Sequence, residues 1–419
     1  MREIIKPASK IDGVIDIPAS KSHSQRVLAC ALISNERTCI YNLGESNDEL
    51  TALEILKSSN KNISTNKNSI TIKASNSFSF KKSEITFNES GLSCRLFTPV
   101  LANANQELKL IGNGSLIERP MKIFDAVFQE LSLKFSSNNN KLPFQIKGPI
   151  TPKTITIDGS LSSQFISGLI YGYVGSDELR DEKIILKNPT STPYLELSLE
   201  VLKSFGVNLK IKNNTIQFNG PYHLKPTEIT IENDWSSASF FIVAACLLGS
   251  ITFKNINPNS KQADISILSV IEEFGAHIKW DGNNLNVSKN KCLYFNFDAT
   301  NSPDLFPPLA VLASFGTKVS SIKGVKRLFA KESNRAKTIQ SELSKLGAII
   351  NISDDVMYIS PALKPITQKV SSCNDHRIAM AASIFALMLE KPTEIIQSTA
   401  INKSFPSFYK LLDSVTSQA

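Results

Sequence analysis

The sequence has few of the residues that mark metal sites, disulfide frameworks or membrane spans. Its six cysteines show no CxxC or Cys/His spacing and several lie in apolar runs, so we expect buried reduced thiols and no metal site. No apolar run approaches the roughly 20 residues that a membrane helix needs, and the N-terminus has no apolar signal core. We therefore expect a cytoplasmic protein without a membrane partner.

The composition is that of a globular protein with a basic bias. The chain has 419 residues, of which 42% are apolar and 20% charged, and its formal net charge is +8. Such values exclude wholesale disorder and favour anionic partners without naming them. An RNA-binding protein would need aromatic stacking platforms, and Trp235 and Trp280 are isolated in the sequence. We expect no nucleic-acid partner.

An internal repeat organises the chain. Each copy reads as a strand, a strongly apolar helix, a strand, an amphipathic helix and a hairpin, with a Gly expected to cap the amphipathic helix and Asn, Asp or Gly at the hairpin turn. Six apolar helices begin at steps of 67 to 74 residues. Their anchor residues are Ser22, Gly91, Ser162, Ser236, Pro303 and Asp375. A helix that is apolar on nearly all sides is expected to be buried on nearly all sides.

The sixth copy lacks its hairpin, whereas two strands, Arg2 to Lys6 and Gly13 to Ile17, stand unused at the N-terminus. We therefore expect the N-terminal strands to complete the last copy. The prediction is an α/β protein of two lobes, each with three βαβαββ units around buried parallel helices. The continuous lobe would span residues 17–229, and the discontinuous lobe 1–16 and 230–419.

The buried helices would bring their N-termini together at one end of each lobe. Unpaired N–H groups and the helix dipole make such ends favourable for anions. Ser, Asp, Asn and Gly at these starts are also ordinary N-caps, and any one cation near them is more often a solvated charge. The recurrence of cations at corresponding places in the repeat is what favours an anion site.

These residues resemble 5-enolpyruvylshikimate-3-phosphate synthase, an enolpyruvyl transferase family, in order along almost the whole chain. The matching motifs are Ser20-Lys21-Ser22…Arg26, Gly91…Arg95, Glu118-Arg119-Pro120, Ser162-Ser163-Gln164-Phe165, Pro193-Tyr194, Asp234…Ser236-Ser237-Ala238-Ser239, Pro303-Asp304, Lys331-Glu332-Ser333-Asn334-Arg335 and Asn374-Asp375-His376-Arg377. The family's fold, an inside-out α/β barrel in two lobes with two chain crossings, matches the architecture that the repeat predicts.

The resemblance implies transfer of the enolpyruvyl group of phosphoenolpyruvate to the 5-hydroxyl of shikimate 3-phosphate, without a metal or other cofactor, in aromatic amino acid biosynthesis. These two small molecules are the expected partners of a monomer. For phosphoenolpyruvate the resemblance implies Lys21, Gly91, Arg119, Gln164, Arg335, Arg377 and Lys403. For shikimate 3-phosphate it implies Lys21, Ser22, Arg26, Ser162, Ser163, Gln164, Ser191, Tyr194, Asp304, Arg327 and Lys331.

The reaction is an addition followed by an elimination, so it needs a base for the 5-hydroxyl and an acid for the methylene carbon. Asp304 is the candidate base and Glu332 the candidate acid, with Lys21 as a competing proton carrier. A carboxylate among cations has a lowered pKa, which suits Asp304 as a base and suits Glu332 less well as an acid. Helix capping by Asp304 and an ion pair of Glu332 are the structural alternatives.

The sequence also departs from the family pattern. The family commonly has Asn-Ala-Gly-Thr where this chain has Glu89-Ser90-Gly91-Leu92. Gly91 is kept, and a glycine permits close approach of the backbone to a ligand. Glu89 adds a negative charge near the expected anion site. Arg327 is expected to add a cation near the phosphate of shikimate 3-phosphate.

Three other readings compete with this one. The nearest is the enolpyruvyl transferase that acts on UDP-N-acetylglucosamine, which has the same lobe design and a loop cysteine; neither Cys94 nor Cys373 lies in that loop context. A repeat protein that binds RNA would use the positive charge. An inactive enzyme kept as a binding module would lack part of the cation and carboxylate set, which is complete here.

Overall fold

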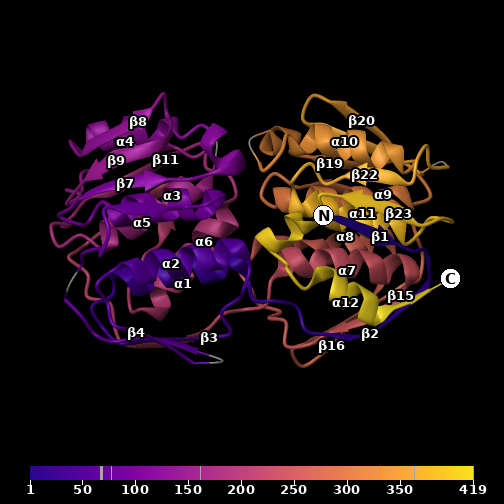
Figure 1. The fold of residues 1–419 in the computed structure, drawn as a ribbon, viewed down its shortest axis with the longest axis horizontal. Coiled ribbons are helices and arrows are strands. Elements are labelled where there is room, and N and C mark those ends of the chain that lie inside the picture. The colour runs from indigo at the N-terminus through magenta and orange to yellow at the C-terminus, as the bar shows by residue number, and fades with distance from the viewer. Residues whose placement is uncertain (67–68, 77, 161, 330, 363, 419) are drawn as a thin grey trace. The chain divides into compact units, whose positions relative to one another are not determined.

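The computed structural model describes residues 1–66, 69–76, 78–160, 162–329, 331–362 and 364–418. The chain divides into two compact units, a continuous unit of residues 19–232 and a discontinuous unit of residues 1–18 and 233–419. The repeat predicted these boundaries after residues 16 and 229. Figure 1 shows the indigo N-terminal strands among the orange and yellow elements of the discontinuous unit.

The continuous unit contains three copies of the repeat, each with one four-stranded sheet. The first copy is α1 (Lys21–Ile33), β3 (Thr38–Tyr41), α2 (Asn47–Ser58), β4 (Ile63–Asn66) and β5 (Ser69–Ile72), with β14 (Thr227–Thr230). The second is β6 (Glu84–Thr86), α3 (Gly91–Leu101), β7 (Glu107–Ile111), η1 (Gly114–Glu118), α4 (Lys122–Glu130), β8 (Lys134–Asn138) and β9 (Lys141–Lys147). The third is β10 (Ile155–Asp158), α5 (Ser163–Val174), β11 (Lys183–Lys187), α6 (Thr192–Ser204), β12 (Ile211–Lys212) and β13 (Thr215–Gln217).

The apolar helices α1, α3 and α5 form the centre of this unit and pack on one another. Every residue of α3 is buried. Glycines on α5 let the two helices approach closely, since a Cβ on Gly168 or Gly172 would collide with backbone carbonyls of α3 at Arg95 and Pro99. The prediction of helices buried on all sides is therefore confirmed for this unit.

The discontinuous unit repeats the pattern. Its first copy is β2 (Ala8–Ile15), α7 (Trp235–Leu248), β15 (Gly249–Phe253), η2 (Ala263–Ser266), α8 (Ile267–Phe274), β16 (His277–Asp281) and β17 (Asn284–Ser288). The second is β18 (Asn296–Asp298), η3 (Pro303–Leu305), α9 (Phe306–Ser314), β19 (Ser320–Lys323), η4 (Val325–Leu328), α10 (Arg335–Lys345), β20 (Ile349–Ser353) and β21 (Val356–Ser360). The third is β22 (Lys369–Ser371), α11 (His376–Ala386), β23 (Thr393–Ile396), η5 (Ser398–Lys403), α12 (Phe408–Val415) and β24 (Thr416–Gln418), with β1 (Arg2–Ile5). Helices α7, α9 and α11 pack on one another in the core.

Strand pairing corrects the prediction for the N-terminal strands. β1 pairs antiparallel with β23 of the sixth copy. β2, however, pairs parallel with β15 of the fourth copy and antiparallel with β24. The prediction that both strands complete the last copy is therefore wrong for the second strand. The first copy of each unit needs a parallel first strand, and segments next to the chain crossings provide it: β2 beside β15, and β14 beside β3.

Local capping explains where the central helices begin. Five of them have a side chain that accepts a hydrogen bond from a backbone N–H of the first turn, namely Ser20, Ser90, Ser162, Asp234 and Asp375. The capping interpretation of these residues is thus confirmed. Three amphipathic helices are followed by glycines with positive φ, as predicted from the sequence: Gly206, Gly275 and Gly347.

Two expectations from the composition can be compared with the structure. Cys30, Cys39, Cys94 and Cys246 are buried free thiols, as predicted, whereas Cys292 is partly buried and Cys373 is exposed. In the part of the chain that the structure describes, every helix is too short or too polar to cross a lipid bilayer.

Candidate active site

In the continuous unit, the start of α1 carries a lysine held by a carboxylate. The Lys21 Nζ lies 3.0 Å from the Asp48 Oδ2 at the start of α2, and both side chains are more than four-fifths buried. Helix α2 is fixed there because Glu49 closes a capping box with Ser46 and accepts a hydrogen bond from the Ser24 hydroxyl at 2.7 Å. The amine of Lys21 is therefore positioned by the first turn of a neighbouring helix.

Arg26 is a fully buried guanidinium between α1 and α6. Its Nε donates to the Ser198 Oγ at 2.8 Å, its Nη1 to the Ser22 carbonyl at 2.8 Å and its Nη2 to the Tyr194 carbonyl at 3.3 Å. The guanidinium carbon also lies 5.7 Å from the centre of the Tyr194 ring. Ser191, the residue before α6, is buried and left-handed, with a φ of 53°. Four predicted residues for shikimate 3-phosphate thus lie in one cluster, namely Ser22, Arg26, Ser191 and Tyr194.

A second cluster joins α3, α5 and η1. The Arg119 guanidinium rests on the backbone of Gly91, where an added Cβ would stand 2.5 Å from Nη1. The Arg95 Nη1 donates to the Gln164 Oε1 at 2.9 Å. The predicted phosphoenolpyruvate residues Gly91, Arg119 and Gln164 are therefore close to Arg95. Ser162 caps α5, and Ser163 is buried in its first turn.

The Glu89 side chain packs against Gly114, where an added Cβ would overlap its carboxylate. Gly114 has a φ of 53° and opens η1, the 3-10 helix that leads into Arg119. The Arg119 Nη2 lies 3.4 Å from the Ser115 Oγ of the same helix. Glu89, which departs from the family pattern, thus contacts the segment that carries Arg119.

In the discontinuous unit, Asp304 on η3 is surrounded by three cations. Its Oδ1 accepts from the Arg335 Nη1 at 2.8 Å and lies 3.2 Å from the Lys331 Nζ. Its Oδ2 accepts from the Arg377 Nη2 at 3.1 Å. Four of the predicted site residues, from η3, the loop before α10, α10 and α11, therefore form one cluster.

These cations control the charge of Asp304. Burial alone would raise the pKa of this carboxyl, but Arg377, Lys331 and Arg335 together hold the pKa well below its usual range. Burial lowers the pKa of Lys331, and the negative charge of Asp304 opposes that effect. The lowered pKa agrees with the expectation for a carboxylate among cations.

Arg335 is the centre of the same cluster. Its Nη2 also donates to Glu332, and its Nε and Nη2 donate to both oxygens of Asp375. The Lys403 Nζ donates to the Asn374 carbonyl at 2.9 Å, which places it beside the start of α11. Arg327, in η4, is partly buried, and burial lowers its pKa while the charge of Asp304 opposes this.

Some residues of these clusters were not predicted from the sequence. Asp48, Ser198 and Asp375 hold Lys21, Arg26 and Arg335, respectively. Asp48 and Ser198 lie in helices that show only amphipathic spacing. Asp375 belongs to a quoted motif but was interpreted as a helix start. Only the three-dimensional contacts identify the carboxylates of Asp48 and Asp375 and the hydroxyl of Ser198 as partners of the predicted cations.

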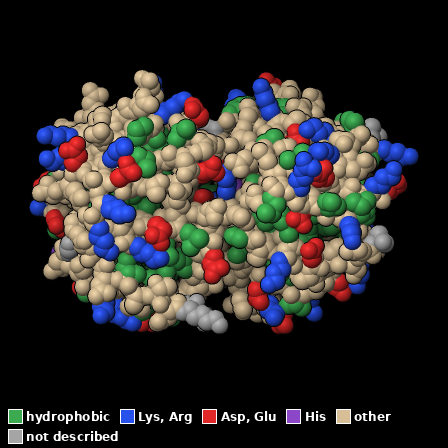
Figure 2. All heavy atoms as spheres, viewed as in Figure 1, with side chains coloured by type: hydrophobic (Ala, Val, Ile, Leu, Met, Phe, Trp, Pro, Cys, Tyr) green, Lys and Arg blue, Asp and Glu red, His purple; other side chains and the backbone are tan. Residues whose placement is uncertain are grey.

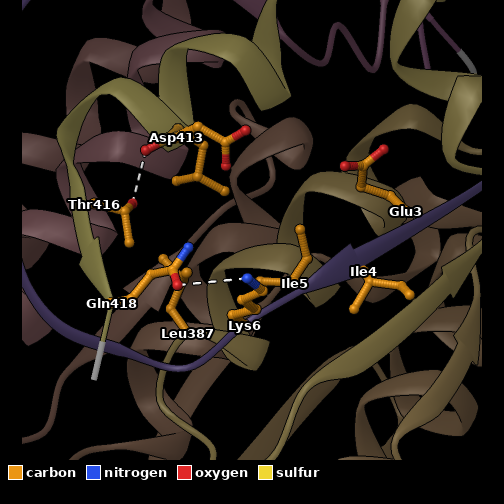
Figure 3. Close-up of a pocket in the computed structure, with 9 residues that line it drawn as sticks. Glu3, Ile4, Ile5, Lys6, Leu387, Asp413, Thr416 and Gln418 are labelled. Atoms are coloured by element: carbon orange, nitrogen blue, oxygen red, sulfur yellow. Dashed lines mark hydrogen bonds between the residues drawn. The ribbon is translucent and has the colours of Figure 1, made fainter.

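Other surface features fit the expected anions poorly. A pocket where β1, α12 and β24 meet contains Glu3, Asp413 and Lys6, and Figure 3 shows the Lys6 amine directed toward Gln418. Burial, and then the charge of Asp413, raises the pKa of Glu3. Two carboxyl groups and one amine do not suit a phosphorylated substrate. On the face shown in Figure 2, described Lys and Arg side chains are interspersed with Asp and Glu and form no basic stripe.

Comparisons with known proteins show the family of this chain. Residues 5–412 match the family model described as EPSP synthase (3-phosphoshikimate 1-carboxyvinyltransferase). The chain is 32% identical to the 3-phosphoshikimate 1-carboxyvinyltransferase of Clostridium novyi, with 97% of this chain and 96% of the relative aligned. It is 33% identical to the protein of the same name from Clostridium acetobutylicum, with 95% and 94% aligned.

The fold is also similar to solved structures. The EPSP synthase of Acinetobacter baumannii superposes with a TM-score of 0.82 at 23% identity, covering 100% of this chain and 98% of the other. An enolpyruvyl transferase from Streptomyces tendae gives a TM-score of 0.78 at 14% identity, covering 98% and 96%. These likenesses confirm the predicted fold class. With a family match over nearly its whole length and relatives of 32–33% identity aligned over at least 94% of both chains, the chain belongs to the EPSP synthase family.

Proposed function

We propose that this chain transfers the enolpyruvyl group of phosphoenolpyruvate to the 5-hydroxyl of shikimate 3-phosphate, and that the clusters described above carry the reaction. The observation that supports the assignment most strongly is Asp304 held by Arg335, Lys331 and Arg377. Both substrates are multiply anionic, so buried guanidinium groups with preorganised donors suit them.

In the first step, the substrate 5-hydroxyl oxygen forms a bond to C2 of phosphoenolpyruvate, while its proton leaves to a base and the methylene carbon gains a proton. In the second step, the C2–O bond to phosphate breaks, and the methyl carbon loses a proton as the double bond forms again. The products are the enolpyruvyl ether and phosphate. The protein must therefore hold two anions and move protons at two atoms.

We propose that Asp304 is the base that accepts the proton of the 5-hydroxyl. In the substrate-free protein its carboxylate is a weak base, because three cations lower its pKa. Arg335 and Arg377 belong to the proposed phosphoenolpyruvate set, so an anion bound there shares their charge with Asp304. The pKa of Asp304 then rises when the substrate is present, which is when a base is needed.

We propose that Glu332 is the acid that donates a proton to the methylene carbon, with Lys21 as the alternative donor. Glu332 bonds to Arg335 in the same cluster as Asp304. Lys21 is fixed by Asp48 at the start of α1. Solvent deuterium incorporation into the methylene group of phosphoenolpyruvate distinguishes the two. Glu332→Gln should abolish incorporation, and incorporation that persists in this variant would move the role to Lys21.

For binding, we propose that Lys21, Gly91, Arg119, Gln164, Arg335, Arg377 and Lys403 hold phosphoenolpyruvate. For shikimate 3-phosphate we propose Lys21, Ser22, Arg26, Ser162, Ser163, Gln164, Ser191, Tyr194, Asp304, Arg327 and Lys331. The Arg26 and Arg119 clusters of the continuous unit support this division, because each places a buried arginine beside a helix N-terminus.

A phosphate-release assay tests the proposal. The purified protein should release phosphate from phosphoenolpyruvate with shikimate 3-phosphate and not with UDP-N-acetylglucosamine. Turnover with the nucleotide sugar instead would move the chain to the other enolpyruvyl transferases, and binding of both substrates without turnover would make it a binding module.

A further inference from the structure

Asp264 is a buried carboxyl group that the reaction scheme does not yet use. It is fully buried in η2 and accepts a hydrogen bond from the Ser236 hydroxyl in the first turn of α7. Its neighbour Gln262 holds the same helix end: the Gln262 Oε1 accepts from the Trp235 N–H at 3.1 Å, and its Nε2 donates to the Asn233 carbonyl at 2.9 Å. The segment that carries Asp264 is thus clamped to the start of α7.

The same segment is joined to the element that carries Asp304. The Ser266 Oγ of η2 lies 3.3 Å from the Ser302 Oγ, just before η3. Three charged groups act on the charge of Asp264, namely Asp304 on η3, Arg377 on α11 and Asp234 at the cap of α7. Asp264 is therefore coupled electrostatically to Asp304 and Arg377, which belong to the proposed substrate site.

This environment favours the neutral form of the carboxyl. Burial first, and then the negative charge of Asp304, raise the pKa of Asp264 to about 7, while Arg377 and the Ser236 hydroxyl act in the opposite direction. Asp304 is held ionised by its three cations. The surroundings therefore favour the neutral form of Asp264 and the ionised form of Asp304. Such pairs of carboxyl groups with opposite pKa shifts recur in sites that move protons.

We propose that Asp264 is a positioning residue that couples a proton to the binding of the anionic substrate at Arg377. The proposal rests on the proposed function, because it takes Arg377 as part of the phosphoenolpyruvate site. An anion at Arg377 removes part of the positive charge that stabilises ionised Asp264. The carboxyl therefore holds its proton while the anion is bound, and loses it more readily when the site is empty.

The consequence is a proton linkage in substrate binding. At a pH below the pKa of Asp264 the carboxyl is already neutral, so substrate binding adds no proton to it. Above that pKa, binding must return the proton, so the apparent affinity for phosphoenolpyruvate falls by up to about tenfold per pH unit.

The test compares the KM for phosphoenolpyruvate between about pH 6 and about pH 8 in the full-length protein and three variants. Asp264→Asn keeps the shape of the side chain and removes its ionisable group, so the KM of this variant should not rise with pH as it does in the wild type. Ser236→Ala removes a hydrogen bond to the ionised form, so the rise should begin at a higher pH, by about half to one unit. Ser239→Ala is the matched control: it loses a hydroxyl of the same helix that bonds only the Ser236 carbonyl, and its curve should follow the wild type.

The ionisation of phosphoenolpyruvate itself changes KM equally in the wild type and in every variant. A difference in KM between these proteins therefore comes from the protein. A wild-type rise that persists in Asp264→Asn would overturn the proposal. If Asp264→Asn does not fold, Ser236→Ala decides: a shifted curve supports the linkage, and an unshifted curve refutes it.

A second measurement separates this proposal from the proposed function. A potentiometric difference titration of substrate-free wild type against Asp264→Asn should show one additional proton released near pH 7, whether or not the protein turns over shikimate 3-phosphate. A difference curve without that proton would refute the assignment of the proton to Asp264. A protein that releases the proton but lacks turnover would contradict the proposed function instead.

Discussion

The Arg335 guanidinium donates to both oxygens of the Asp375 carboxylate, from Nε at 2.9 Å and from Nη2 at 3.2 Å, and neither side chain is exposed to solvent. Asp375 also caps α11 by accepting from the Arg377 N–H at 3.0 Å. Arg335 begins α10, so one buried ion pair joins the starts of two helices. It also fixes the arginine that contacts Asp304.

Removing one partner of this pair should be costly. Asp375→Ala leaves the Nε of the buried Arg335 without its carboxylate partner and removes the cap of α11, and we expect the free energy of unfolding to fall by about 3–5 kcal/mol in urea titrations. The control is Lys323→Ala, which breaks an ion pair of similar length, 3.0 Å, whose side chains are more than half exposed. We expect the control to change the free energy of unfolding far less, because water screens an exposed ion pair. Equal losses would contradict the importance of burial.

Gly91→Ala should displace Arg119 with little effect on folding, because the clashing atom is the end of a flexible side chain. If Arg119 binds phosphoenolpyruvate, KM for this substrate should rise by about tenfold or more, and KM for shikimate 3-phosphate should change much less. Gly282→Ala is the control for the KM values: its Cβ would contact nothing within 4 Å, and the strain of an alanine at its φ of 56° should lower stability without changing either KM. Parallel changes in both KM values would argue against a local effect on Arg119.

Ser198→Ala should loosen Arg26. The lost hydroxyl accepts from the Arg26 Nε at 2.8 Å, so we expect KM for shikimate 3-phosphate to rise by about threefold to tenfold through weaker orientation of the guanidinium. Ser204→Ala removes an exposed hydroxyl of the same helix, which donates to the Glu200 carbonyl. The control should keep wild-type kinetics, and a similar rise in both variants would assign the effect to α6 rather than to Arg26.

Asp304→Ala and Lys21→Ala should each abolish phosphate release and leave the circular dichroism spectrum unchanged. Asp304 is the proposed base, and Lys21 is proposed to contact both substrates. Loss of a group that acts on the transition state lowers kcat together with kcat/KM. A variant that keeps a near-normal rate would remove that residue from the mechanism.

Asp264→Asn should become more stable than the wild type as pH rises. The pKa of Asp264 is about 7 in the folded protein, above the usual value of an unfolded aspartate. Between about pH 4 and about pH 7 the unfolded chain therefore binds fewer protons than the folded protein, so rising pH destabilises the wild type and not the variant. We expect a relative gain on the order of 2–4 kcal/mol between urea titrations at about pH 4 and about pH 7.

Asp298→Asn should change the pH dependence of stability in the opposite direction to Asp264→Asn. Burial would raise the pKa of Asp298, but hydrogen bonds from Thr300 and the charge of Lys323 lower it. Its carboxylate stabilises the folded protein above the unfolded pKa, and this stabilisation is lost on acidification. The Asn variant should therefore lose stability relative to the wild type as pH rises. The same trend for both variants would contradict the assignment at Asp264.

The repeat predicted the six central helices because the information is local. Apolar composition sets their burial, and a Ser or Asp before the first turn sets where helices such as α1 and α11 begin. The partner of β2 could not be predicted in this way. β15, with which it pairs, follows far along the chain, and the pattern of alternating residues in a strand does not specify which sheet it joins.

The sequence predicted the cations of the candidate site better than the residues that hold those cations in place. The motif around Lys331 and Arg335 indicated a cluster with Asp304, and the structure brings these residues together. Asp264 stands in a segment without chemical pattern, and only its contact with Ser236 and its burial distinguish it. A residue that acts through a neighbour has no sequence signature of its own.

The pairing of β2 with β15 has a consequence for synthesis on the ribosome. β2 precedes the continuous unit in the chain, yet its parallel partner β15 follows only after that whole unit has been translated. β2 therefore cannot pair with β15 while residues 19–232 emerge, and the discontinuous unit can complete this sheet only after the continuous unit has been synthesised.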